Sequence, residues 1–134
     1  MATLIKEKHR DYKKQEVLCQ KVTYNPAAVT STVTQATNRT TGVALNTTSG
    51  NIVTDTTSLA AEASANFTVT NDKVKIGDVV VLSIRSGSNG GNTAVTVVTV
   101  TNGTFIVKVS NNNAAAGTAE TGAIIINFAI IGVE

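Results

Sequence analysis

The chain has 134 residues, of which 42% are hydrophobic and 15% are charged, and its formal net charge is +2. This length holds one domain, and the apolar fraction excludes a wholly disordered chain. One cysteine and one histidine cannot form an intrachain disulfide framework or a structural zinc site. The sequence has no apolar run of about 18 residues for a membrane helix, and its first residues lack the apolar centre of a signal peptide, so we expect synthesis in the cytoplasm.

The charges are concentrated near the amino terminus. Residues 1–22 contain six basic and three acidic residues, a net charge of +3, whereas residues 23–134 contain five basic and six acidic residues, a net charge of −1. We therefore predict a charged amino-terminal arm over residues 1–28 and a body over residues 29–134.

The arm shows no clean period, so a short helix, an added strand, an arm ordered only on a partner and a solvated tail all stay open. Acidic residues are interleaved with the basic ones, which favours a protein surface over nucleic acid or a membrane as the partner. The candidate docking residues of the arm are Lys6, Lys8, Arg10, Tyr12, Lys13 and Lys14.

The body alternates apolar and polar residues in short segments, which predicts about seven or eight strands. Phe67 and Val69 are expected on the inner face of residues 66–70, and Val80, Leu82 and Ile84 on one face of residues 78–85. The alanine-rich segment 60–65 is long enough for one helical turn only. These patterns predict an all-β protein, a single antiparallel β-sandwich or jelly-roll-like domain.

The clearest local prediction is a β-hairpin around Asn102-Gly103. Asn-Gly between two β-branched runs favours a type I′ turn, in which both central residues have positive φ. The apolar alternation of the first arm changes phase near Val97–Val98, which predicts a β-bulge there.

The last predicted strand, within residues 122–133, is apolar on both faces. Ile124, Ile126, Phe128 and Ile130 share one face, and the other face is interrupted only by Asn127 up to residue 131. Such a strand is either a central strand of a monomeric sandwich or part of a subunit contact, and both readings stay open. The candidate subunit-interface residues are Ile125, Ile131 and Val133.

Few residues could carry chemistry. His9 and Cys19 lie in the arm without a plausible catalytic partner, and the acidic residues of the body are scattered singly. Asp72 and Asp78 flank a loop that contains two lysines, which disfavours a calcium site. We therefore expect no enzymatic activity, no cofactor and no metal. The basic residues of the body lack the interleaved aromatics of a nucleic-acid-binding surface.

Several segments of the body resemble a family. Residues 33–46 with 49–52, residues 67–71, residues 78–81 and residues 125–130 are similar to segments of small structural proteins of tailed bacteriophages. The resemblance covers roughly residues 30–133 and lies in turns and strands. It implies a β-rich virion protein of the capsid decoration (cement) type, frequently trimeric, on the outer capsid surface. Its partners would be the major capsid protein and further copies of itself, and it would be made in the host cytoplasm.

The same resemblance leaves a second function open. Head or tail fibre modules of these phages recognise the host surface, and the loops of residues 86–92 and 110–121 are the candidate binding loops for that role. An enzyme, such as a polysaccharide-cleaving domain, is a weaker third possibility, because the sequence shows no pair of carboxylates.

Overall fold

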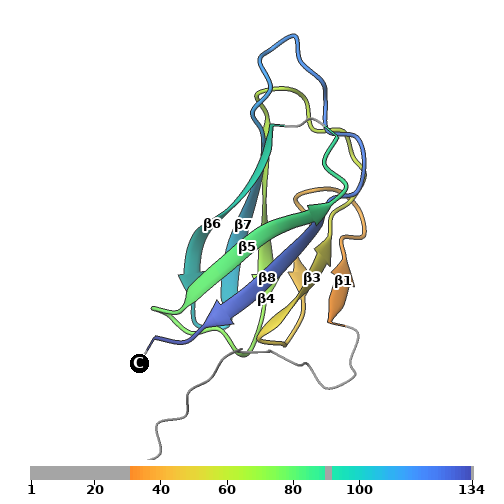
Figure 1. The fold of residues 1–134 in the computed structure, drawn as a ribbon. Helices are drawn as coiled ribbons and strands as arrows, with labels where there is room; N and C mark the ends of the chain where they lie inside the picture. The colour runs from red at the N-terminus through yellow and green to blue at the C-terminus, as the bar shows by residue number, and fades with distance from the viewer. Residues whose placement is uncertain (1–30, 90–91, 134) are drawn as a thin grey trace, which may run out of the picture.

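The computed structural model describes residues 31–89 and 92–133, which form two four-stranded sheets packed face to face (Figure 1). One sheet has the strand order β1-β3-β8-β5 and the other β2-β4-β7-β6. The part of the chain that is described contains no helix, and so none that could span a membrane. The predicted all-β sandwich is confirmed, and the predicted arm, residues 1–28, lies outside the described residues. The strands are β1 (Thr32–Thr34), β2 (Val43–Ala44), β3 (Ser49–Val53), β4 (Ser64–Thr70), β5 (Val79–Ser86), β6 (Thr93–Thr101), β7 (Thr104–Asn111) and β8 (Ile125–Ile131).

The sheets are mixed rather than wholly antiparallel as predicted. β1 pairs with β3 in parallel, and β2 pairs with β4 in parallel, whereas the other strand pairs are antiparallel. The reason is the path of the chain after β1. It crosses to the other sheet to form β2 and then returns, so β3 enters the first sheet in the same direction as β1.

The core lies between the two sheets and follows the predicted alternation. Phe67 and Val69 of β4 are buried, and so are alternate residues of β7 and β8. Phe105 and Phe128 meet across the core with their ring centroids 5.6 Å apart. Val80 of β5 is buried as predicted, and its neighbours Leu82 and Ile84 pack against the same core.

The hairpin of β6 and β7 is confirmed, together with its bulge. Val97 pairs with Val107 and Thr99 with Ile106, so Val98 is the extra residue. The predicted type I′ turn is wrong, because Gly103 has a φ of 82° whereas Asn102 does not have a positive φ. Positive φ at the second central residue alone is the requirement of a type II turn.

The alanine-rich segment 60–65 forms a tight turn and then enters β4. The N–H of Ala63 donates to the carbonyl oxygen of Ala60 (3.1 Å), and Glu62 has a φ of 62°. A helical turn does not form there, because β4 already begins at Ser64.

Candidate interaction surface

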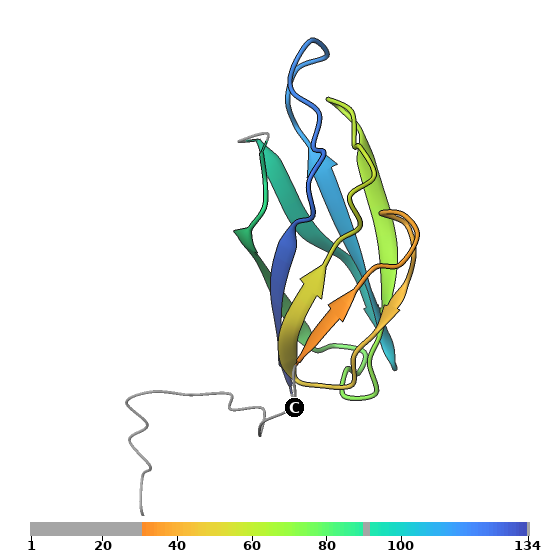
Figure 2. The same ribbon diagram turned by 90° about the vertical axis from the view of Figure 1, so that its right-hand side faces the viewer.

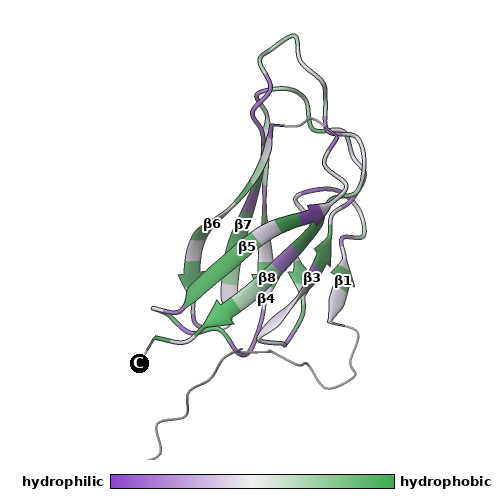
Figure 3. Cartoon of the chain, viewed as in Figure 1, coloured by the Kyte–Doolittle hydropathy of each residue, from purple (hydrophilic) through white to green (hydrophobic). Residues whose placement is uncertain are grey.

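Five exposed aliphatic residues belong to the loop before β5, to β5 and to the end of β8 and the residues after it, at the end of the sandwich here called the apolar end. In Figure 3 the start of β5 and the end of β8 are coloured as hydrophobic. Val79 begins β5 and pairs with Ile131 at the end of β8, so their segments lie side by side. A solvent-exposed cluster of this kind is a common feature of interaction sites. The side chains and their exposed fractions are Ile76 (71%), Val79 (49%), Val81 (49%), Ile131 (44%) and Val133 (61%).

Ile76 is held in its exposed position by the loop of residues 71–78. Its N–H donates to Oδ1 of Asn102 at the β6–β7 turn (2.9 Å), and the N–H of Gly103 donates to the carbonyl oxygen of Val74 (3.0 Å). Val74 itself is buried in the core. The loop is therefore anchored on both sides of Ile76, because the N–H of Lys75 also donates to Oδ2 of Asp78 (2.8 Å).

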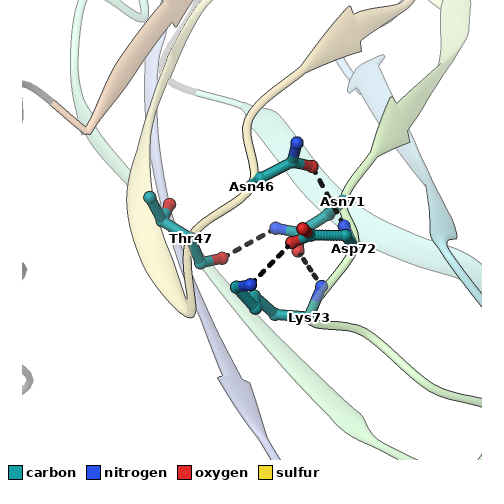
Figure 4. Close-up of polar contacts among 5 residues, drawn as sticks. All are labelled: Asn46, Thr47, Asn71, Asp72 and Lys73. Carbon is teal, nitrogen blue, oxygen red and sulfur yellow. Dashed lines mark hydrogen bonds and ion pairs between the residues drawn. The ribbon is translucent and has the colours of Figure 1, made fainter.

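The buried amide of Asn71 ties the same loop to the turn before β3 (Figure 4). Its Nδ2 donates to the carbonyl oxygen of Thr47 (2.7 Å), and its Oδ1 accepts from the N–H of Lys73 (2.8 Å). The N–H of Asp72 donates to Oδ1 of Asn46 (3.0 Å). The exposed ion pair between Asp72 and Lys73 (3.2 Å) adds little stability beside these bonds. The loop is thus a fixed support for the apolar end.

Both ends of the described chain lie at the apolar end. Figure 2 shows the start of β1 and the carboxyl end of the described residues at the same end of the sandwich, and the loop of residues 110–121 at the other, whereas Figure 1 shows that the two chain ends lie on opposite sides of the molecule. The chain before Ser31 therefore joins the sandwich at the same end as the exposed aliphatic side chains, but at the β1 edge of the sheet, whereas Val79 and Ile131 lie on β5 and β8.

The three predicted interface residues do not form one patch. Ile131 and Val133 belong to the apolar end, whereas Ile125 lies at the opposite end of β8, six residues and about 20 Å from Ile131. A row of polar side chains crosses the outer face of the sheet between them, one from each strand: Thr32, Asn51, Asn127 and Ser83. The predicted docking residues of the arm, Lys6, Lys8, Arg10, Tyr12, Lys13 and Lys14, lie outside the described residues.

The opposite end of the sandwich contains a buried polar network that the sequence did not suggest. Arg39 is 3% exposed, and it donates to the carbonyl oxygens of Thr57, Glu120 (3.2 Å) and Gly122 (2.8 Å) and to Oγ1 of Thr54 (3.0 Å). Burial lowers the pKa of Arg39, and the nearby carboxylates of Glu120 and Asp55 oppose that effect. The guanidinium thereby joins three loops that are distant in sequence.

Glu120 is fully buried and organises the two loops that were predicted as binding loops. Its carboxylate accepts hydrogen bonds from Oγ of Ser88 (3.0 Å), from the N–H of Asn89 (2.6 Å) and from Oγ1 of Thr93. Two amide contacts also join these loops: Asn89 donates to Thr121 (3.1 Å), and Asn92 donates to Asn113 (2.8 Å). The carboxylate of Glu120 therefore has a structural role, because it connects its own loop to the segment that contains Ser88 and Asn89.

No group of three or more His, Cys, Asp or Glu side chains within residues 31–89 and 92–133 is arranged to hold a metal ion. His9 and Cys19 lie outside those residues. An open depression of about 270 Å³ on the sheet is lined without any ionisable side chain, by Ser31, Ser49, Gly50, Asn51, Asn127 and Phe128.

Comparisons with models of known protein families, with curated proteins and with solved structures found no match to this chain.

Proposed function

We propose that this protein is a capsid decoration (cement) protein of a tailed bacteriophage, which binds the outer surface of the head and stabilises contacts between major capsid subunits. The observation that carries this proposal is the position of the apolar end. The exposed aliphatic side chains and the point where the amino-terminal residues join the sandwich lie at the same end of the molecule. One capsid surface could therefore contact the body and the charged arm together.

The size of the apolar end fits a weak contact that is repeated many times. Complete burial of an aliphatic side chain stabilises by about 1.5–3 kcal/mol, so the half-exposed side chains would contribute about 0.7–1.5 kcal/mol each, or about 4–8 kcal/mol for all five. Association itself costs about 4–15 kcal/mol. The apolar end alone would thus bind weakly, and the arm with its net charge of +3 over residues 1–22 would supply the remaining contacts. Cement proteins on a lattice gain further from multivalency.

The experiment measures the occupancy of the full-length protein on undecorated heads of the parent phage. Ile76→Asp adds a charge at a side chain that is 71% exposed, so it should reduce occupancy without unfolding the body. Ala115→Asp is the matched control, because Ala115 is an exposed loop residue at the opposite end. A second variant lacks residues 1–22 and should bind weakly while its body stays folded.

Two results would count against this proposal. One is unchanged occupancy for both Ile76→Asp and the shortened chain. The other is a larger loss for Ala115→Asp than for Ile76→Asp, which would make the loop end the binding end. Cosedimentation gives the occupancy, and particle reconstruction gives the copy number and the orientation of the body.

A fibre module for host recognition is the second candidate function, and one observation favours it. Within the two predicted binding loops, residues 86–89 and 92 lie near residues 110–121 at the end opposite the apolar end, where Asn92 donates a hydrogen bond to Asn113. Two loops that are joined by a hydrogen bond, at the end of the sandwich farthest from the virion, would suit a receptor contact. Copy number separates the functions: hundreds of copies per particle indicate cement, and a few indicate a fibre.

A further inference from the structure

We propose that β6 is a self-pairing edge, through which two copies of this chain join in an antiparallel β6–β6 contact around a two-fold axis. Within the described part of the chain, β6 pairs with β7 on one side and with no strand on the other. It is nine residues long and contains neither a charged residue nor a proline. Natural edge strands are usually protected by shortness, charge, proline or a bulge, and of these β6 has only the bulge at Val98. A weakly protected edge is a template for another strand.

The other sheet edges carry such protection. β1 has three residues and β2 has two, which is too short for a stable ladder. β5 carries Arg85 and an irregular register near its end. Figure 1 shows β6 at a flank of the molecule, away from the short edges. β6 is therefore the edge best suited to strand addition.

The sequence of β6 indicates that its partner is a second β6. Residues 95–100 read Val-Thr-Val-Val-Thr-Val, which is the same in both directions. In an antiparallel pair the second strand runs in the opposite direction, so a register centred between Val97 and Val98 places like residues opposite each other. Val95 would face Val100 of the second copy, and Thr96 would face Thr99. A different partner strand would not require this internal symmetry.

The bulge at Val98 makes this register compatible with the two faces of the sheet. In a regular strand, residues five apart such as Val95 and Val100 point to opposite faces, and the pairing would place an inner residue opposite an outer one. The extra residue changes the phase, so that both valines pack against the core while Thr96 and Thr99 are exposed. The two-fold contact would therefore pair Val95 with Val100, both inner residues, and Thr96 with Thr99, both outer residues, whereas the central pairs join the inner Val97 to the bulged Val98.

The electrostatics also permit self-pairing. The nearest charged side chain on the same sheet is Lys108 of β7, which pairs with Thr96. In the joined sheet, β7 and its copy would be three strand spacings apart, about 14 Å, which exceeds the Debye length of about 8 Å at physiological salt. Val98, which is 51% exposed in the single chain, would lie at the axis and lose exposure. The product is one continuous eight-stranded sheet.

This contact uses neither the apolar end nor the arm, so it goes beyond the proposed function. It is also distinct from the trimer that the resemblance implies, because an isologous two-fold contact produces dimers.

The test compares two double variants of the full chain that differ only in the sign of one charge. Thr96→Glu/Thr99→Glu places two carboxylates opposite each other at both outer pairs, and Thr96→Glu/Thr99→Lys places a carboxylate opposite an ammonium group. Sedimentation equilibrium over a wide concentration range, with a chain mass of 13.8 kDa, gives the dissociation constants. We expect a dimer of the unmodified chain, and a dissociation constant at least about tenfold higher for the first variant than for the second.

Circular dichroism checks that both variants are folded, and hydrogen exchange on the unmodified chain provides a test without mutation. The amides of residues 94–101 should become more protected as the protein concentration rises. The proposal is overturned by an unmodified chain that stays monomeric at millimolar concentration. Equal dissociation constants for the two variants, or a trimer that is insensitive to both, would also overturn it.

Discussion

Replacing Arg39 with methionine is expected to lower the free energy of unfolding by about 2–4 kcal/mol. The guanidinium donates four hydrogen bonds. Two of the acceptors keep another donor, because Thr54 Oγ1 also accepts from the N–H of Ile124 and the Glu120 carbonyl oxygen also accepts from the N–H of Leu59. The carbonyl oxygens of Thr57 and Gly122 would lose the donor that Arg39 provides.

An unsatisfied buried polar group costs about 1–3 kcal/mol, so two of them cost about 2–6 kcal/mol. Two effects reduce this value. The loop of Thr57 is exposed, so water can reach its carbonyl group, and the variant no longer buries a charged group. For a folded body of about 100 residues, 2–4 kcal/mol corresponds to a melting temperature about 10–25 °C lower.

Urea unfolding followed by circular dichroism measures this change, and Arg85→Met is the matched control. Arg85 is exposed on the outer face of β5, so its replacement should change stability by less than about 0.5 kcal/mol. A loss below about 1 kcal/mol for Arg39→Met, with a normal control, would refute the reasoning. It would show that the three loops hold one another without the guanidinium.

Gly87 and Gly103 both have positive φ, but only at Gly87 would a Cβ overlap another group, the carbonyl oxygen of Ala123. Gly103→Ala should therefore cost about 1–2 kcal/mol in thermal unfolding, and Gly87→Ala about 3 kcal/mol or more; similar costs would contradict the predicted overlap. The hydroxyl and N–H of Thr57 hold the pKa of Asp55 below its usual value, so NMR titration should show a low pKa that rises in Thr57→Val. Because the folded pKa is depressed, this contribution to stability is present above the unfolded pKa of about 3.9 and is lost as the pH falls through the lower folded value; an unchanged pKa in Thr57→Val would contradict the assigned cause.

The features predicted correctly from the sequence are those with a local physical cause. Alternation within β4 and β5 identified their inner faces, since side chains of a strand alternate between two sides. The phase change near Val97 identified the bulge for the same reason. The parallel pairs of β1 and β2 could not be predicted, because strands of three and two residues are too short to show a period. The turn type predicted for Asn102-Gly103 was wrong because tertiary contacts also act on Asn102. One of them is the hydrogen bond that its Oδ1 accepts from the N–H of Ile76.

The residues of the candidate surface and of the buried polar network also differ in whether a local sequence pattern indicates them. Ile131 and Val133 were predicted as interface residues because their segment is apolar on both faces, and both side chains are exposed in the structure. Ile76 was missed because it lies outside any alternating segment, and its only signal was an isoleucine between Lys75 and Gly77 in a loop. Arg39 and Glu120 were missed because they are 81 residues apart, and such a pair leaves no pattern in a single sequence.

The exposure of Ile76 follows from how its loop is built. Val74, two residues earlier, fills the core position, and the buried Asn71 supplies hydrogen bonds that a free loop would otherwise seek from water. With the core position taken and Ile76 itself bonded to the β6–β7 turn, the isoleucine cannot turn inward without breaking these contacts. The fold therefore holds an apolar side chain in solvent on a fixed support. Since a preorganised contact residue loses little conformational freedom on binding, this arrangement would lower the entropic cost of the docking contact proposed above.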